Sequence, residues 1–106
     1  MTYDEFAKDV IRTINHGLDE DKHILCGIMG LVGESGELAD AIKKVYFQGH
    51  RLDIEKMKDE LGDVLFYFAY LSETLGIRIE DIMKHNVAKR AERYPYGFET
   101  ERSVNR

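Results

Sequence analysis

Residues 53–76 read DIEKMKDELGDVLFYFAYLSETLG, and the spacing of their apolar side chains predicts one long helix over residues 53–75. The apolar residues recur at intervals of three and four, which is typical of a helix that packs against other helices. Gly76 follows the last of them and suits a left-handed C-cap. The members of this apolar stripe are Met57, Leu61, Val64, Phe68, Leu71 and Leu75.

The chain before this segment predicts two more helices. Thr2 and Glu5 have the spacing of a capping box, so the first helix should begin at Thr2. Gly17 is suited to end it in a left-handed conformation. The second helix is predicted over residues 22–47, with Asp21 as its N-cap.

A fourth helix is predicted over residues 80–93, although no good capping residue precedes it. It ends before Pro95, the only proline in the chain, because proline disfavours helix in the residue before it. Four helices with short connections predict an all-α fold, an antiparallel four-helix bundle. We expect the helical domain to cover residues 1–98 and a polar tail to follow at residues 99–106.

The apolar surface of these helices predicts self-association. Phe47, Phe66 and Tyr70 add apolar surface outside the stripe of the third helix. A monomer would expose part of this surface, and large exposed apolar patches are uncommon on soluble monomers. Closed symmetric pairing is the commonest solution, so we expect at least a homodimer.

The composition narrows the function classes. The chain carries 20 acidic and 15 basic residues and a formal net charge of −5, which argues against a nucleic-acid partner. Its single cysteine, Cys26, excludes a disulfide within the chain. No apolar run approaches the roughly 18 residues of a membrane span, and the acidic N-terminus does not resemble a secretory signal. We therefore expect a cytoplasmic protein that binds neither nucleic acid nor membranes.

Four carboxylates occupy positions that a plain helical bundle would not give them. Glu34 and Glu37 are three residues apart, as are Glu60 and Asp63, so each pair shares one helix face. At about 100° per residue, Glu34 falls within the apolar arc of its helix and points toward the core. Glu60 lies at the edge of the apolar stripe on the next helix.

Carboxylates that face a core need a partner, because burying an unpaired charge is expensive. The partner could be a set of basic side chains or a shared cation. Oxygen ligands suit a hard cation, and Mg²⁺ or Mn²⁺ fits better than zinc. Two such pairs on consecutive helices, both turned toward apolar stripes, favour the cation.

Glycine recurs at every third position of the second helix, at Gly27, Gly30, Gly33 and Gly36. Each glycine costs about 1 kcal/mol relative to alanine in a helix interior, so the run needs a physical reason. One interpretation is close packing between helices, which we favour. The other is space beside the acidic pair at Glu34 for a metal-bound polyphosphate.

The fourth helix carries a polar face. Asn86, Lys89 and Arg93 follow at intervals of three and four and therefore lie on one side. An amide and two cations in line suit phosphate oxygens, although a solvated basic face would have the same pattern. Tyr67, one helical turn past Asp63, is a candidate to stack on a nucleotide base.

These motifs together resemble the MazG-like nucleotide pyrophosphohydrolases, an all-α family whose hallmark is E-x-x-E followed by E-x-x-D. The two halves are ESGE at residues 34–37 and ELGD at residues 60–63. The words NVAKR at residues 86–90 and RYPYGF at residues 93–98 are similar to the family's last motif. The resemblance extends over residues 2–98, and Phe66 stands where the family often has Trp.

The resemblance implies an enzyme that uses Mg²⁺ to cleave a nucleoside triphosphate into a monophosphate and pyrophosphate, often to remove non-standard or excess nucleotides. It implies metal binding by the four carboxylates and phosphate binding by the polar face of the fourth helix. It also implies a homotetramer, built as a dimer of dimers, as an alternative to the homodimer. The implied metal ligands are Glu34, Glu37, Glu60 and Asp63, and the implied phosphate contacts are Asn86, Lys89 and Arg93.

The attacking water must lose a proton, and our hypothesis is that Glu37 accepts it. Two alternatives from other classes stay open. A phosphoribosyl-ATP pyrophosphatase resembles this fold, but residues 86–98 fit the MazG-like pattern better. A non-catalytic module for nucleotide sensing or helical dimerisation is the second, and the complete set of four acids argues against it.

Overall fold

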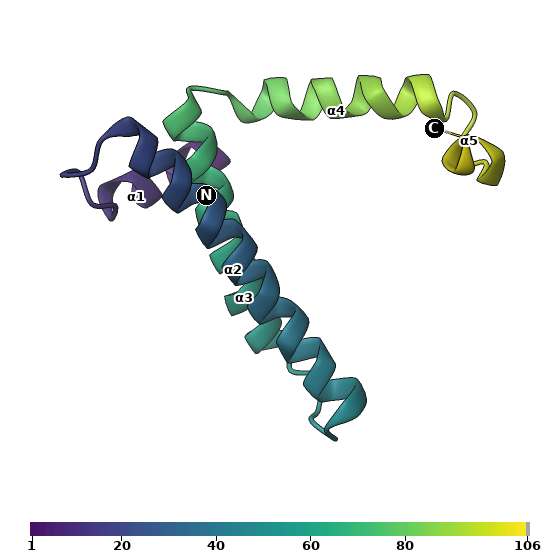
Figure 1. Ribbon diagram of the computed structural model, residues 1–106, viewed down its shortest axis with the longest axis horizontal. Helices are drawn as coiled ribbons and strands as arrows, with labels where there is room; N and C mark the ends of the chain where they lie inside the picture. The colour runs from purple at the N-terminus through teal and green to yellow at the C-terminus, as the bar shows by residue number, and fades with distance from the viewer. Residues whose placement is uncertain (106) are drawn as a thin grey trace. The chain divides into compact units, whose positions relative to one another are not determined.

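The computed structural model describes residues 1–105, and α-helices are the only regular secondary-structure elements in this range (Figure 1). Beyond an isolated bridge between Pro95 and Gly97, this part of the chain contains no β-structure, so the predicted all-α class is confirmed. None of its helices has the length and apolar content that crossing a membrane requires. The helices are α1 (Tyr3–Arg12), α2 (Glu20–Phe47), α3 (Ile54–Leu75), α4 (Ile79–Arg93) and α5 (Thr100–Val104).

The chain divides into two compact units. The first unit, Met1–Gly76, contains α1, α2 and α3, and the second unit begins at Ile77 and contains α4 and α5. Because α4 belongs to the second unit, the four-helix bundle stays a prediction. The five-residue α5 lies within the segment that we expect to be a polar tail.

Helix α1 begins as predicted but ends earlier. Thr2 accepts a hydrogen bond from the Glu5 backbone N–H at 3.1 Å, and the Glu5 carboxylate accepts one from the Thr2 N–H. The predicted end at Gly17 is wrong, because α1 ends at Arg12 with Thr13 as its C-cap. The Thr13 hydroxyl donates to a carbonyl of the last turn, and Gly17 has no left-handed backbone. Side-chain hydrogen bonds of this kind compete with further helix.

The other helix ends agree with the sequence, with one exception. The predicted N-cap Asp21 is wrong, because Asp19 accepts the hydrogen bond from the Lys22 N–H at 2.9 Å and starts α2 two residues earlier. Both aspartates are suitable caps, and the first one that reaches a free N–H sets the start. Gly76 ends α3 in a left-handed conformation with φ of 69°, which confirms the prediction. Helix α4 lacks a side-chain cap, also as predicted.

Helices α2 and α3 form an antiparallel hairpin and lie side by side along their length (Figure 1). A Cβ atom added at Gly30 would lie 2.2 Å from Cε1 of Tyr67, and one at Gly27 would lie 3.1 Å from Cβ of Leu71. These two glycines therefore allow the helices to approach closely. A Cβ at Gly33 or Gly36 would meet nothing within 4 Å, so packing does not explain that half of the run.

The core of the first unit is small and lies where α1 packs against the C-terminal half of α3. The Tyr3 hydroxyl forms a 3.0 Å hydrogen bond with the Ser72 hydroxyl at this crossing. The rest of the hairpin has little cover. The fully buried apolar residues of the core are Ala7, Val10, Ala69 and Tyr70.

Large apolar side chains stay exposed on the uncovered part of the hairpin. Met29 and Val32 are 69% and 68% exposed, and with Leu25 they lie on the side of α2 opposite its contact with α3. Leu61 and Leu65 of α3 are exposed as well. These side chains form an exposed apolar outer face on the hairpin.

Gly30→Ala should destabilise the protein. The added methyl group would displace the Tyr67 ring or separate the helices, and overpacking of this kind costs about 1–3 kcal/mol. The gain in helix propensity offsets about 1 kcal/mol of that loss. The free energy of unfolding, measured in urea, should therefore fall by up to about 2 kcal/mol.

Gly62→Ala is the matched control, because a Cβ at Gly62 would meet nothing within 4 Å. This variant should gain up to about 1 kcal/mol from helix propensity alone. Equal effects of the two substitutions would contradict the close contact between α2 and α3 at Gly30.

Candidate metal centre

Three of the four predicted metal ligands meet on the hairpin. Glu34 comes from α2, and Glu60 and Asp63 come from α3. One carboxylate oxygen from each lies within 4.8 Å of the other two. Glu34 and Glu60 are half-buried and Asp63 is exposed, so the cluster opens to solvent on one side.

The register of the hairpin brings these residues together. Gly30 contacts Tyr67, and this contact fixes how α2 and α3 align. Glu34 lies one turn after Gly30, and Asp63 lies one turn before Tyr67. Because α2 and α3 run antiparallel, both steps lead to the same end of the hairpin. The two carboxylates are therefore at the same level of the hairpin, and Glu60 joins them from the preceding turn of α3.

The carboxylates of the cluster repel one another. The pKa of Glu34 is raised above its ordinary value, first by burial and then by the negative charges of Asp63, Glu60 and Glu37. The sequence leaves open whether basic side chains neutralise the acids. Within residues 1–105 one cation pairs with the cluster, since Lys56 Nζ lies 3.6 Å from Glu60 Oε1.

Sequence reasoning missed Lys56 as a neighbour of the site. The signal was present, because Lys56 precedes Glu60 by four residues and therefore shares its helix face. A single half-exposed ammonium group at 3.6 Å does not balance three carboxylates. Oxygen-only donors with excess negative charge fit a hard divalent cation such as Mg²⁺ or Mn²⁺.

Glu37 lies outside this cluster of three. Its side chain is exposed, although its charge still contributes to the raised pKa of Glu34. The neighbouring basic pair belongs to another acid, because Lys43 and Lys44 approach Asp40 at 2.9 and 3.0 Å and lower its pKa to about 2. The predicted roles of Glu37 as a metal ligand and as a proton acceptor stay predictions.

Tyr67 is half-buried between the two long helices. Its ring packs against the Gly30 backbone and makes an edge contact with Phe66, with ring centroids 5.0 Å apart. Burial raises its pKa first, and the nearby Cys26, Glu34 and Asp63 groups add to that shift. The ring adjoins the acidic cluster, and its predicted contact with a base stays a prediction.

The polar face of α4 is present in the second unit. Asn86 and Lys89 line one hollow beside the helix, and Lys89 and Arg93 line a second. Lys89 thus joins the two hollows, which places the three side chains along one side of α4 as their spacing predicts. Their contribution to phosphate binding stays a prediction.

The sequence matches known proteins over most of this region. The family described as MazG nucleotide pyrophosphohydrolase domain matches residues 25–98, which include every predicted site residue and exclude α5. The Gene 37 protein of Mycobacterium phage L5 is 35% identical over 65 residues, or 58% of this chain. The chain spans about half of that relative, 57% of its length. No solved structure matches the chain.

Glu34→Gln should raise the melting temperature of the metal-free protein at neutral pH. Folding raises the pKa of Glu34, so the folded state binds its proton more tightly than the unfolded state does. Ionised Glu34 therefore costs stability above that raised pKa. Below the ordinary pKa of 4.5 both states hold the proton, and the cost disappears.

The measurement is thermal unfolding in EDTA across this pH range. The difference in melting temperature between Glu34→Gln and the parent should shrink as the pH falls. Glu37→Gln is the control and should give a smaller rise, because Glu37 is the weakest of the three negative neighbours of Glu34. A difference that does not depend on pH would contradict the repulsion within the cluster.

Proposed function

The chain belongs to the MazG nucleotide pyrophosphohydrolase family, and on this premise we propose that it hydrolyses a nucleoside triphosphate to a monophosphate and pyrophosphate with Mg²⁺. The observation that carries the proposal is the cluster of Glu34, Glu60 and Asp63. Its oxygen donors and uncompensated charge fit a hard cation, and polyphosphate cleavage is a reaction that such a cation assists.

The carboxylates of the cluster would hold the metal ion. When bound, Mg²⁺ supplies charge neutralisation at the phosphate oxygens and a more acidic water molecule. Glu37 is exposed and stands beside the cluster rather than in it, so its carboxylate is free to accept the proton of the attacking water. The water oxygen would form a bond to phosphorus as the anhydride bond between the α and β phosphates breaks, and pyrophosphate would leave.

The second unit would bind the phosphates. Lys89 and Arg93 carry charged donors on the same side of α4, and Asn86 adds a neutral amide. Charge-assisted hydrogen bonds from these groups would stabilise the negative charge that develops on the leaving pyrophosphate. Tyr67, which adjoins the acidic cluster, is proposed to contact the base.

The products of the reaction test the proposal. With Mg²⁺ and a panel of canonical and modified nucleoside triphosphates, the protein should release pyrophosphate and the matching monophosphate from at least one substrate. Glu60→Gln should abolish this release, because it removes a charge from the metal site. A preference for phosphoribosyl-ATP, products of diphosphate and orthophosphate, or nucleotide binding without turnover would each refute it.

We also propose that the protein is a homodimer, with a tetramer as a dimer of two such dimers. The support is the exposed outer face of the hairpin, which includes Leu25, Met29 and Val32. A small domain gains stability when a second copy covers such a face.

Sedimentation of the purified protein tests this assembly. The parent should sediment at a multiple of its 12.3 kDa mass at micromolar concentration. Val32→Lys should shift it toward the monomer, because it buries an unpaired charge in the contact. Val104→Lys is the matched control, since Val104 is similarly exposed but lies on α5. An active monomeric parent would refute the proposal.

A further inference from the structure

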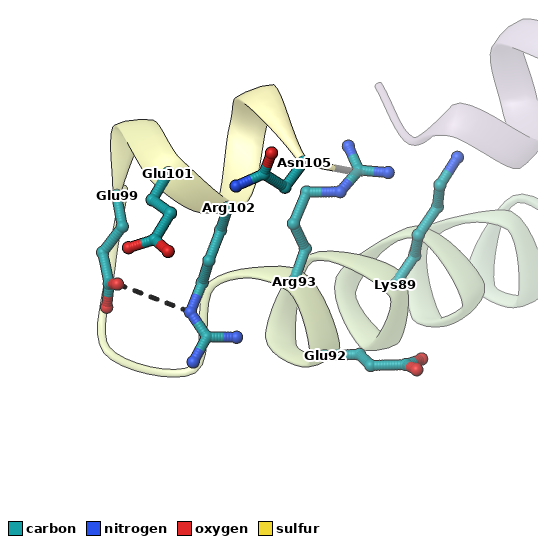
Figure 2. Close-up of a pocket in the computed structure, with 7 residues that line it drawn as sticks. All are labelled: Lys89, Glu92, Arg93, Glu99, Glu101, Arg102 and Asn105. Atoms are coloured by element: carbon teal, nitrogen blue, oxygen red, sulfur yellow. Dashed lines mark ion pairs between the residues drawn. The ribbon is translucent and has the colours of Figure 1, made fainter.

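The chain turns back after α4 and forms a groove. Gly97, with φ of 99°, takes a left-handed conformation, and its N–H donates to the Tyr94 carbonyl at 3.2 Å. The rings of Tyr94 and Phe98 contact each other across this turn at a tilt of 37°, with centroids 5.5 Å apart. The turn brings α5 beside the last turns of α4 and leaves a groove of about 590 Å³ between them (Figure 2). The residues that line it are Lys89, Glu92, Arg93, Glu99, Glu101, Arg102 and Asn105.

The charges in the groove are separated. Figure 2 shows Lys89 and Arg93 at one end, and Glu99 and Glu101 on the far side, along α5. Within the described residues, neither Lys89 nor Arg93 forms an ion pair. Lys89 and Arg93 therefore keep donors that no ion pair occupies, although the Glu92 carboxylate of the same helix also lines the groove. Asn105 adds a side-chain amide, which can donate to an anion.

Arg102 lies between these two ends and is held only weakly. Its Nε atom is 3.4 Å from Oε2 of Glu99, and the two side chains are 45% and 46% exposed. An exposed ion pair of this kind contributes little, because water screens it. A guanidinium group has five N–H donors, so Arg102 keeps several for a second partner. A multiply charged phosphate group would compete well with Glu99 for them.

Helix stability accounts for only part of this arrangement. Cations in the last turn of a helix interact favourably with its carbonyl groups, and Arg90 and Arg93 both occupy the last turn of α4. Arg90 can fill that role without lining the groove. Arg102 occupies the last turn of the five-residue α5, and its side chain lines the same groove as Arg93.

We propose that Arg102 and Asn105 bind the pyrophosphate part of the substrate together with Lys89 and Arg93. The inference rests on the proposed function and extends it, because the family match ends at residue 98 and does not include α5. Arg102 and Asn105 thus lie outside the matched region, next to the cations of α4 that lie within it. The groove takes a diphosphate group, as the β and γ phosphates of a nucleotide or as free pyrophosphate.

Titration of the full-length protein with inorganic pyrophosphate in EDTA tests the groove without the metal centre. Arg102→Gln should weaken binding about tenfold, which corresponds to one lost charge-assisted hydrogen bond. Glu99→Gln should tighten binding, because it frees Arg102 from its competing partner. Arg90→Gln is the matched control and should bind as the parent does. Calorimetry gives the dissociation constants, and circular dichroism checks the helix content of each variant.

The proposal is overturned if the parent shows no binding, or if Arg102→Gln binds pyrophosphate as tightly as Arg90→Gln does. A parallel assay of nucleoside triphosphate hydrolysis with Mg²⁺ separates this outcome from failure of the proposed function. A parent that hydrolyses the nucleotide while Arg102→Gln binds normally would refute only the role of α5. A parent that does not hydrolyse nucleotides, with the expected opposite shifts of the two variants, would refute the hydrolase and leave the groove as a diphosphate site.

Discussion

The contact between the Gly30 backbone and the Tyr67 ring determines the geometry of the candidate metal centre. At this level the helices are as close as a glycine permits, since a Cβ would lie 2.2 Å from the ring. The Tyr67 ring fits against the bare backbone at Gly30, where any larger residue would overlap it. Glu34 and Asp63 each lie one turn from this contact, so the packing that holds the hairpin together also aligns the acids.

That alignment lowers the stability of the folded protein, because it brings like charges together. Asp40 and Glu34 lie on the same helix, but their pKa values shift in opposite directions. Two lysines lower the pKa of Asp40, whereas burial and negative neighbours raise that of Glu34. A carboxylate with cationic partners is already satisfied, whereas one among other carboxylates is still repelled by its neighbours. Local conflicts of this kind are expected where a protein binds or reacts.

The small core and the second unit both reflect how few residues the chain has to cover its long helices. Helix α1 covers only the end of the hairpin near Tyr70, so large apolar side chains elsewhere on the hairpin stay exposed. After α4, a turn at Gly97 brings five more helical residues back along the chain and adds polar groups to the end of α4. Both features leave side chains exposed rather than adding depth to a core.

The sequence by itself determined the all-α class, the starts of α1 and α3, and the acidic pairs, because caps, periodicity and spacing are local properties of a chain. It did not determine that α1 stops at Arg12, where side-chain hydrogen bonds compete with helix. Only the tertiary structure decided that Glu34 joins Glu60 and Asp63 while Glu37 stays outside. Side chains three residues apart on a helix point in directions that differ by about 60°. Which of the two faces the neighbouring helix depends on how the helices align, and no local sequence pattern encodes that alignment.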